Sequence, residues 1–170
     1  QAVFRYQDAQ TDDAALTQAV MRSAQSLGAE LVVPGEFLGA QRTANGYAVR
    51  YRTPRGETES HCTALVNAAG PWINSVLARI TPHVPPAAIE LGQGTHIVLG
   101  GPLHRGAYYT EAEDGRAVFV MPWRGMALVG TTETRFSGDP AQVQPLTAEV
   151  EYLLRTFHRY FPERSMQVRD

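Results

Sequence analysis

Short apolar runs separated by glycine and proline dominate the second half of the chain, and they limit most strongly what it can fold into. Four of these runs cover residues 94–99, 107–110, 117–122 and 126–131. Short apolar segments with turn residues between them are typical of an antiparallel sheet. Residues 147–160 follow with apolar side chains at helical spacing. We therefore predict an antiparallel sheet with one packing helix.

The first half predicts a helix and a three-stranded meander. The helix is expected over 12–28, with Asp12 or Thr11 as its cap and Gly28 at its C-terminal end. A short strand is expected over 30–33. The meander strands are expected over 37–41, 47–53 and 58–67, with Asn45-Gly46 as a hairpin signal, and the last strand is expected to end in a core.

The whole chain therefore reads as α+β, with two lobes. Residues 71–79 look helical, and Pro82, Pro85 and Pro86 then interrupt any regular element. We expect this stretch to cross between a first lobe, 1–80, and a second lobe, 81–170.

Composition excludes several classes of function. The net charge is −2 and all 15 cationic residues are arginine. No basic excess points to nucleic acid, and no lysine is present for a Schiff base. Cys62 is the single cysteine, the histidines lack metal-ligand spacing, and no apolar run reaches the roughly 18 residues of a membrane span. The Asp and Glu residues look like solvated surface charges.

Three segments are candidates for chemistry. Small residues at 67–70 lead into Pro71-Trp72, which fits either a close backbone approach to a ligand or an ordinary strand-to-helix turn. His96 follows a glycine-rich entry and is either a proton acceptor or a hydrogen-bonded histidine at a strand end. Thr131 and Thr132 fit either a polar substrate contact or a threonine-rich strand end. No Gly-x-Gly-x-x-Gly motif is present.

Six segments in this order resemble FAD-dependent glycerol-3-phosphate dehydrogenases, which belong to the two-lobed D-amino-acid-oxidase-like flavoproteins. The family's Lys-Gly-Ser-His-Ile-Val segment is similar to 93–98, where Gln93 and Thr95 replace Lys and Ser. In the opening segment, Ala15 replaces an Arg. The matching segments are Phe4–Asp8 with Asp12–Ala14, Val66–Trp72, Gly94–Val98, Phe119–Trp123, Val129–Glu133 and Gly138–Pro140.

The resemblance implies FAD as cofactor and glycerol 3-phosphate as substrate, with electrons passing to quinone. Its substrate-side residues would be Thr95, His96, Thr131 and Thr132, with His96 as the catalytic base. The first lobe would then hold part of the FAD site and the second lobe part of the substrate site. The FAD contacts that it implies are Phe37, Asn67, Ala68, Ala69, Gly70, Pro71 and Trp72.

The glycine fingerprint and the family's later arginine-bearing segment are absent, and the chain begins at Gln1 and ends at Asp170. We therefore expect a fragment that is inactive alone and holds FAD weakly or not at all. The parent enzyme would be cytoplasmic, peripheral on the inner membrane, with self-association left open. Two alternatives remain: a flavin oxidoreductase acting on an amine or a 2-hydroxy acid, and a non-enzymatic binding module for a small phosphorylated ligand.

Overall fold

The structure, a computed structural model, describes residues 4–103 and 105–164 and divides the chain into two compact units. The first unit comprises residues 1–68 and 75–85, and the second comprises 69–74 and 86–170. This division differs from the expected lobes, 1–80 and 81–170. The first unit extends to residue 85, and residues 69–74 belong to the second unit. The assignment of FAD to one lobe and of substrate to the other stays a prediction.

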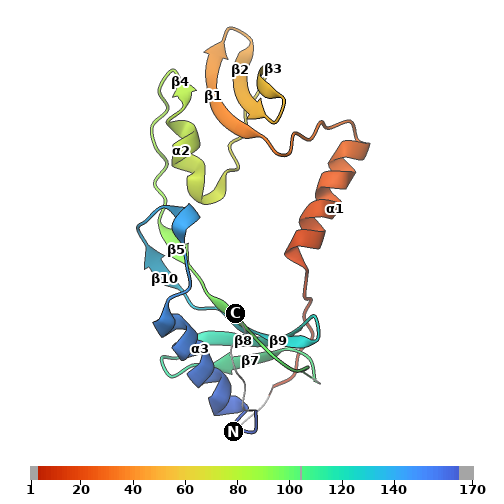
Figure 1. Cartoon of the computed structure of the whole chain (residues 1–170), viewed down its shortest axis with the longest axis vertical. Helices are drawn as coiled ribbons and strands as arrows, with labels where there is room; N and C mark the ends of the chain where they lie inside the picture. The colour runs from red at the N-terminus through yellow and green to blue at the C-terminus, as the bar shows by residue number, and fades with distance from the viewer. Residues whose placement is uncertain (1–3, 104, 165–170) are drawn as a thin grey trace. The chain divides into compact units, whose positions relative to one another are not determined.

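The first unit contains helix α1 and a four-stranded sheet in the order β3-β2-β1-β4 (Figure 1). The three-stranded meander is present as predicted, with antiparallel pairing, and β4 pairs in parallel with β1. The first turn requires glycine, because Gly46 has a φ of +143° and a Cβ there would lie 1.9 Å from the Cys62 carbonyl oxygen. The elements are α1 (Asp13–Ser26), β1 (Glu36–Thr43), β2 (Gly46–Thr53), β3 (Gly56–Cys62) and β4 (Ile80–Thr81).

Two strand predictions in this unit are wrong. Residues 30–33 form no strand, and β3 ends at Cys62 rather than at residue 67. Val66 is 84% exposed, so the apolar run that was expected to end in a core lies at the surface of the structure described. By contrast, α1 begins as predicted, since the Asp12 carboxylate accepts the Ala15 N–H at 3.0 Å.

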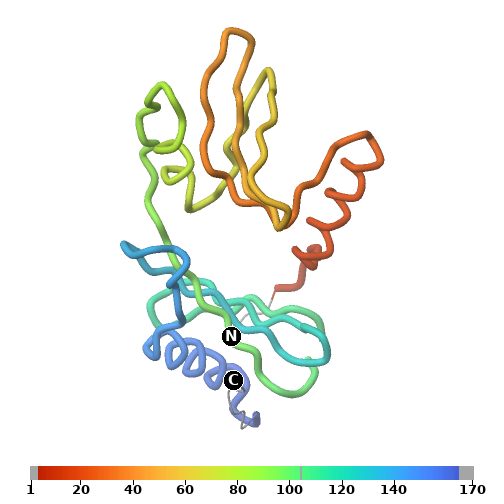
Figure 2. Tube along the Cα trace, turned by 45° about the horizontal axis from the view of Figure 1, so that its top comes forward, coloured from red at the N-terminus to blue at the C-terminus, as the bar shows by residue number. Residues whose placement is uncertain are grey.

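The second unit contains an antiparallel sheet in the order β6-β9-β8-β7, as predicted, with helix α3 against it (Figure 2). Its core joins the buried side chains of this sheet to Leu153 and Phe157 of α3. A two-stranded sheet, β5 with β10, was not predicted. The elements are η1 (Gly70–Trp72), β5 (Leu91–Gln93), β6 (His96–Leu99), β7 (Tyr108–Glu111), β8 (Ala117–Trp123), β9 (Met126–Gly130), β10 (Thr134–Phe136), η2 (Pro140–Gln142) and α3 (Thr147–Tyr160). Helix α2 (Ile73–Leu77) crosses the boundary between the units.

Candidate functional site

The second sheet has one covered face and one open face. Successive side chains of a strand point to opposite faces, and the burial along β6, β8 and β9 alternates in step. The face toward α3 carries the fully buried side chains, including Leu99, Val120 and Val129. The opposite face is less buried. At its centre lie Val98, Phe119, Met121 and Leu128, which are partly buried, and His96, which is exposed. We call these five residues the open face.

His96 is the first residue of β6 and lies at the end of the open face. Its partner in the register is Gly130, which also pairs with Phe119 on the other side. A Cβ on Gly130 would lie 2.2 Å from the imidazole Cδ2, so the ring rests against the glycine backbone. Only glycine leaves room for the imidazole at this position.

A second glycine allows the two predicted substrate segments to meet. A Cβ on Gly94 would lie 2.6 Å from the Thr131 hydroxyl and 2.8 Å from the Thr132 carbonyl oxygen. Thr95 and Thr132 then form two hydrogen bonds, from the Thr95 N–H to the Thr132 hydroxyl (2.8 Å) and from the Thr132 N–H to the Thr95 carbonyl oxygen (3.3 Å). The structure thus brings together all four predicted substrate-side residues, and their contact with substrate stays a prediction.

Glu149, in the first turn of α3, lies beneath these segments and is 4% exposed. Its carboxylate accepts hydrogen bonds from three threonine hydroxyls, one amide side chain and one backbone N–H. The donors are Thr95 (2.8 Å), Thr132 (2.8 Å), Thr134 (3.1 Å), Gln93 (2.9 Å) and the Leu146 N–H (3.0 Å). All five donors are uncharged, so none of these contacts is an ion pair.

These donors decide the charge of Glu149. Burial by itself would raise the pKa of this carboxyl, but the hydrogen bonds from the Leu146 N–H, Thr95, Thr132 and Gln93 outweigh burial and lower the pKa to about 2. The N-terminal end of a 14-residue helix also favours an anion there. Glu149 is therefore ionised at neutral pH.

The sequence analysis missed Glu149, because it treated the acidic residues as solvated surface charges. In the structure, Leu146 precedes the first turn and Glu149 accepts its N–H. The usual sequence signal for this arrangement has Ser, Thr, Asp or Asn at the cap position, and Leu146 stands there instead, so the pattern did not mark Glu149.

A hollow of about 300 Å³ lies beside Gly94 within the second unit. Pro71 and Trp72, both predicted to contact the cofactor, line it together with β5 and the segment around η2. Asn74 fixes the Trp72 segment, because its side-chain amide exchanges two hydrogen bonds with the Ala87 backbone, at 2.8 and 3.0 Å. The lining residues are Pro71, Trp72, Leu91, Gly92, Gln93, Gly94, Phe136, Pro140 and Val143.

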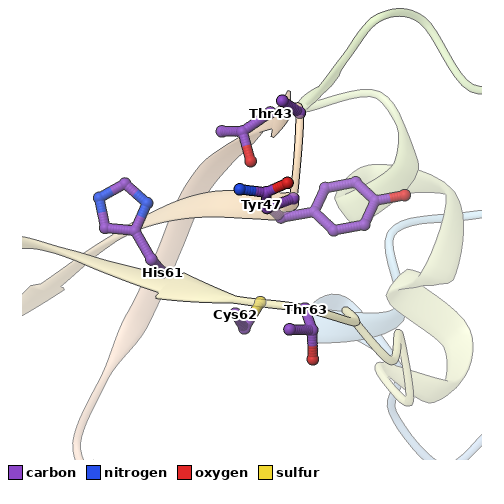
Figure 3. Close-up of a pocket in the computed structure, with 7 residues that line it drawn as sticks. Thr43, Tyr47, His61, Cys62 and Thr63 are labelled. Atoms are coloured by element: carbon purple, nitrogen blue, oxygen red, sulfur yellow. The ribbon is translucent and has the colours of Figure 1, made fainter.

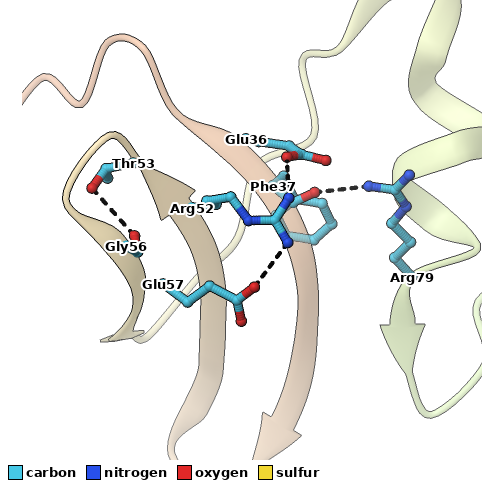
Figure 4. A network of polar contacts seen from close by, with 7 residues as sticks. All are labelled: Glu36, Phe37, Arg52, Thr53, Gly56, Glu57 and Arg79. Carbon is cyan, nitrogen blue, oxygen red and sulfur yellow. Dashed lines mark hydrogen bonds and ion pairs between the residues drawn. The ribbon is translucent and has the colours of Figure 1, made fainter.

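The remaining predicted FAD contacts lie in both units. Ala69 and Gly70 precede Trp72 in the second unit, whereas Phe37, Asn67 and Ala68 belong to the first. The Phe37 carbonyl oxygen accepts a hydrogen bond from the Arg79 guanidinium at 2.9 Å (Figure 4). Their contact with FAD stays a prediction.

A more open hollow of about 500 Å³ lies at the end of the first sheet (Figure 3). Tyr47, His61 and Cys62 line it with neighbouring residues of the β1–β2 turn. No group of three potential metal ligands occurs among residues 4–103 and 105–164. Within the same ranges, no helix is long and apolar enough to cross a bilayer.

Comparison with known proteins identifies the family. The profile described as "DAO: FAD dependent oxidoreductase" matches residues 1–170, so the chain belongs to this family of flavin-dependent oxidoreductases. The chain is 33% identical to a glycerol-3-phosphate dehydrogenase of Pseudomonas aeruginosa over 95% of its own length and 32% of that protein's. It is 30% identical to a D-erythritol 1-phosphate dehydrogenase of Brucella abortus, over 95% of its length and 33% of the relative's.

A solved structure agrees with this assignment. The glycerol-3-phosphate dehydrogenase of Bacillus halodurans, determined with FAD, superposes with a TM-score of 0.83 at 26% identity. The match covers 93% of this chain and 33% of that one. The chain therefore spans about a third of the length of these relatives. The α+β fold and the resemblance drawn from the sequence are both confirmed.

Proposed function

We propose that this chain is the part of an FAD-dependent glycerol-3-phosphate dehydrogenase that covers the reacting end of the flavin. The reaction is oxidation of glycerol 3-phosphate to dihydroxyacetone phosphate. The observation that carries the proposal is the open face, a half-buried apolar sheet surface with a single imidazole at its edge. A flat apolar surface of this kind suits a planar ring system with a polar substrate held beside it.

The residues present fit a flavin. The hollow beside Gly94 combines an indole ring with apolar side chains, and Gly130 leaves the open face without a side chain between His96 and Phe119. Ala69 to Trp72 would hold the cofactor in the second unit, and Phe37, Asn67 and Ala68 would do so in the first. Bound FAD supplies the acceptor for the hydride that leaves the substrate.

The chain's own residues would orient the substrate and take its proton. His96 accepts the proton of the C2 hydroxyl as the C2–H bond breaks with its electron pair, which leaves the C2 ketone. Thr131, beside it, offers a hydroxyl to the substrate's polar groups. The substrate phosphate needs cationic partners. By the family resemblance, Gln93 replaces a lysine, so it supplies no cation. In this proposal those cations lie outside the chain.

The test is His96→Ala in the complete flavoprotein, with His61→Ala in the first sheet as the matched control. We expect kcat to fall by about 10²–10⁴-fold for the first variant and to stay unchanged for the second. Flavin content and thermal unfolding, measured alongside, separate lost chemistry from lost cofactor. A His96→Ala enzyme with full turnover would remove this residue from the proposed role.

The turnover assay can also compare polyol phosphates as substrates. The comparison is needed because one relative is named for D-erythritol 1-phosphate. Glycerol 3-phosphate should be oxidised with the higher kcat/KM. Preference for erythritol phosphate, for an amine or for a 2-hydroxy acid would reassign the substrate class. Calorimetric binding of glycerol 3-phosphate to the 170-residue chain without flavin would instead favour a binding module.

The proposal also covers the electron acceptor and the cellular location of the complete enzyme. Electrons pass to quinone, and the complete enzyme sits peripherally on the cytoplasmic face of the inner membrane; the support for both is the family resemblance. Flotation with phospholipid vesicles and reoxidation by a soluble quinone analogue test them. Failure of the analogue to reoxidise the flavin would contradict the quinone assignment.

A further inference from the structure

We propose that Glu149 is a positioning residue for the reaction: from the covered side of the sheet, it holds His96 and Thr131 in place on the open side. The inference rests on the proposed function, since it concerns the same site. It also goes beyond that proposal, because Glu149 lies in α3 and does not belong to the open face.

The hydrogen bonds among Thr95, Thr132 and Glu149 have a fixed direction. An ionised carboxylate only accepts, so the Thr95 and Thr132 hydroxyls must both turn their protons toward Glu149. The Thr132 oxygen is then free to accept the Thr95 N–H at 2.8 Å. A directed chain results, from the Thr95 N–H through the Thr132 hydroxyl to Glu149.

The position of the neighbouring residues follows from these hydrogen bonds. Thr95 and Thr132 are buried on the covered side, while His96 and Thr131, each one position along the chain, are exposed. Fixing two buried threonines therefore fixes the backbone that carries two exposed groups. The position of the imidazole against Gly130 is restricted, because a Cβ at residue 130 would lie only 2.2 Å from the ring.

The cost of disturbing the anchor depends on which hydroxyl is lost. The Glu149 carboxylate has five donors, so it remains hydrogen-bonded when the Thr134 hydroxyl alone is lost. Loss of the Thr132 hydroxyl is different, because it also leaves the buried Thr95 N–H without its acceptor. The strands shift to recover that partner, and a misplacement of about 1 Å at a reacting group is enough to lower turnover by about 10²-fold.

Thr132 and Thr134 provide a matched pair for the test. Both hydroxyls donate to the same oxygen of Glu149, but only Thr132 also bonds to Thr95. We expect Thr132→Val in the complete flavoprotein to lower kcat about tenfold or more, and Thr134→Val to stay within about twofold. Thr132→Ser, which retains the hydroxyl, should restore turnover.

Glu149→Gln tests the anchor itself, because the amide must donate where the carboxylate accepted. This variant should lower kcat like Thr132→Val, and the double variant should be no worse than either single one, since both cut the same chain. If Glu149→Gln does not fold, the three Thr132 and Thr134 variants still decide the question.

A second readout does not depend on turnover. Diethyl pyrocarbonate modifies accessible imidazoles, and peptide mass spectrometry gives the rate at each histidine. We expect His96 to react faster in Thr132→Val and Glu149→Gln, at an unchanged rate in Thr134→Val, with His61 as the internal standard. Because no substrate is needed, this result stands even if the complete protein does not oxidise glycerol 3-phosphate.

Two outcomes would overturn the inference. One is a Thr132→Val protein with normal kcat and an unchanged His96 modification rate. The other is equal damage from Thr132→Val and Thr134→Val, which would reduce Glu149 to a general stabiliser of the second unit.

Discussion

The molecule contains two four-stranded sheets that are stabilised in different ways. The sheet of the second unit packs against α3 through fully buried side chains, among them Leu99, Val118 and Phe157. The sheet of the first unit buries only small or edge residues: Ala40, Ala48 and Ile80. Helix α1 of the same unit has no buried residue at all. One sheet therefore has its own core, and the other depends on its turns and its strand ladder.

The comparison also shows how each sheet uses charge. The second unit buries one carboxylate and surrounds it with neutral donors. The first unit places its charges at the surface, where Arg52 bridges Glu36 and Glu57 at 2.8 Å each (Figure 4). A buried polar cluster responds strongly when a buried group loses its only partner, whereas exposed ion pairs contribute little.

The largest expected effect comes from equivalent leucines on the two 14-residue helices. Leu153 of α3 is fully buried and Leu16 of α1 is 53% exposed. Leu153→Ala should lower the free energy of unfolding by about 2–5 kcal/mol, while Leu16→Ala should stay within about 0.5 kcal/mol. Urea unfolding followed by tryptophan fluorescence reports on the second unit, which contains both Trp72 and Trp123. Circular dichroism, which reports on both units, is the measurement for Leu16→Ala. Equal losses of unfolding free energy in the two variants would contradict the difference proposed between the two units.

Acid should weaken the second unit through Glu149. Its folded pKa of about 2 lies below the unfolded value of 4.5, so its contribution is complete above pH 4.5 and is lost as the pH falls toward 2. The loss amounts to roughly 3 kcal/mol. Glu149→Gln should flatten this dependence in unfolding titrations by fluorescence.

Glu151→Gln is the control, because Glu151 is exposed on the same helix and pairs only loosely with Arg155, at 3.8 Å. An acid transition of the same size in Glu149→Gln as in the unmodified chain would contradict the assignment.

Two turn glycines test whether the first sheet depends on its turns. Both have positive φ, but a Cβ on Gly46 would collide with the Cys62 carbonyl, whereas a Cβ on Gly56 meets nothing within 4 Å. Gly46→Ala should therefore cost more than the roughly 1 kcal/mol expected for Gly56→Ala from backbone strain alone. Hydrogen exchange of the β1 and β2 amides, read by mass spectrometry, measures the difference. Equal exchange in the two variants would count against a turn-dependent sheet.

The smallest effect is expected at Arg52. Arg52→Gln removes two exposed ion pairs, and we expect a slight fall in stability that vanishes at high salt. Thermal unfolding at low and high salt measures it. A large, salt-independent loss would show that surface charge supports the first sheet more than its turns do.

The sequence predicted the second unit better than the first, and the reason lies in burial. The helix over 147–160 was predicted to the residue, because its apolar stripe faces a real core. The run at 64–66 misled the prediction, because apolar composition alone does not say that a segment is covered. The pairing of β5 with β10 joins three-residue strands about forty residues apart, and no local signal marks it.

The candidate site shows the same limit. The family resemblance implied that His96, Thr131 and Thr132 share one cavity. The structure places their segments side by side, and their contact with substrate stays a prediction. The environment of Glu149 was not predictable in detail, since its donors come from three separate stretches of chain, 93–95, 132–134 and Leu146. Only the tertiary fold brings them to one carboxylate.

The anchoring of β6 by α3 has a consequence for biosynthesis. Glu149 is 54 residues downstream of Thr95, so a ribosome completes β6 long before it makes the residue that secures it. During translation the imidazole end of this strand lacks its anchor until α3 has left the exit tunnel. The hydrogen bond that joins the Thr95 segment to α3 is thus among the last features of this unit to form.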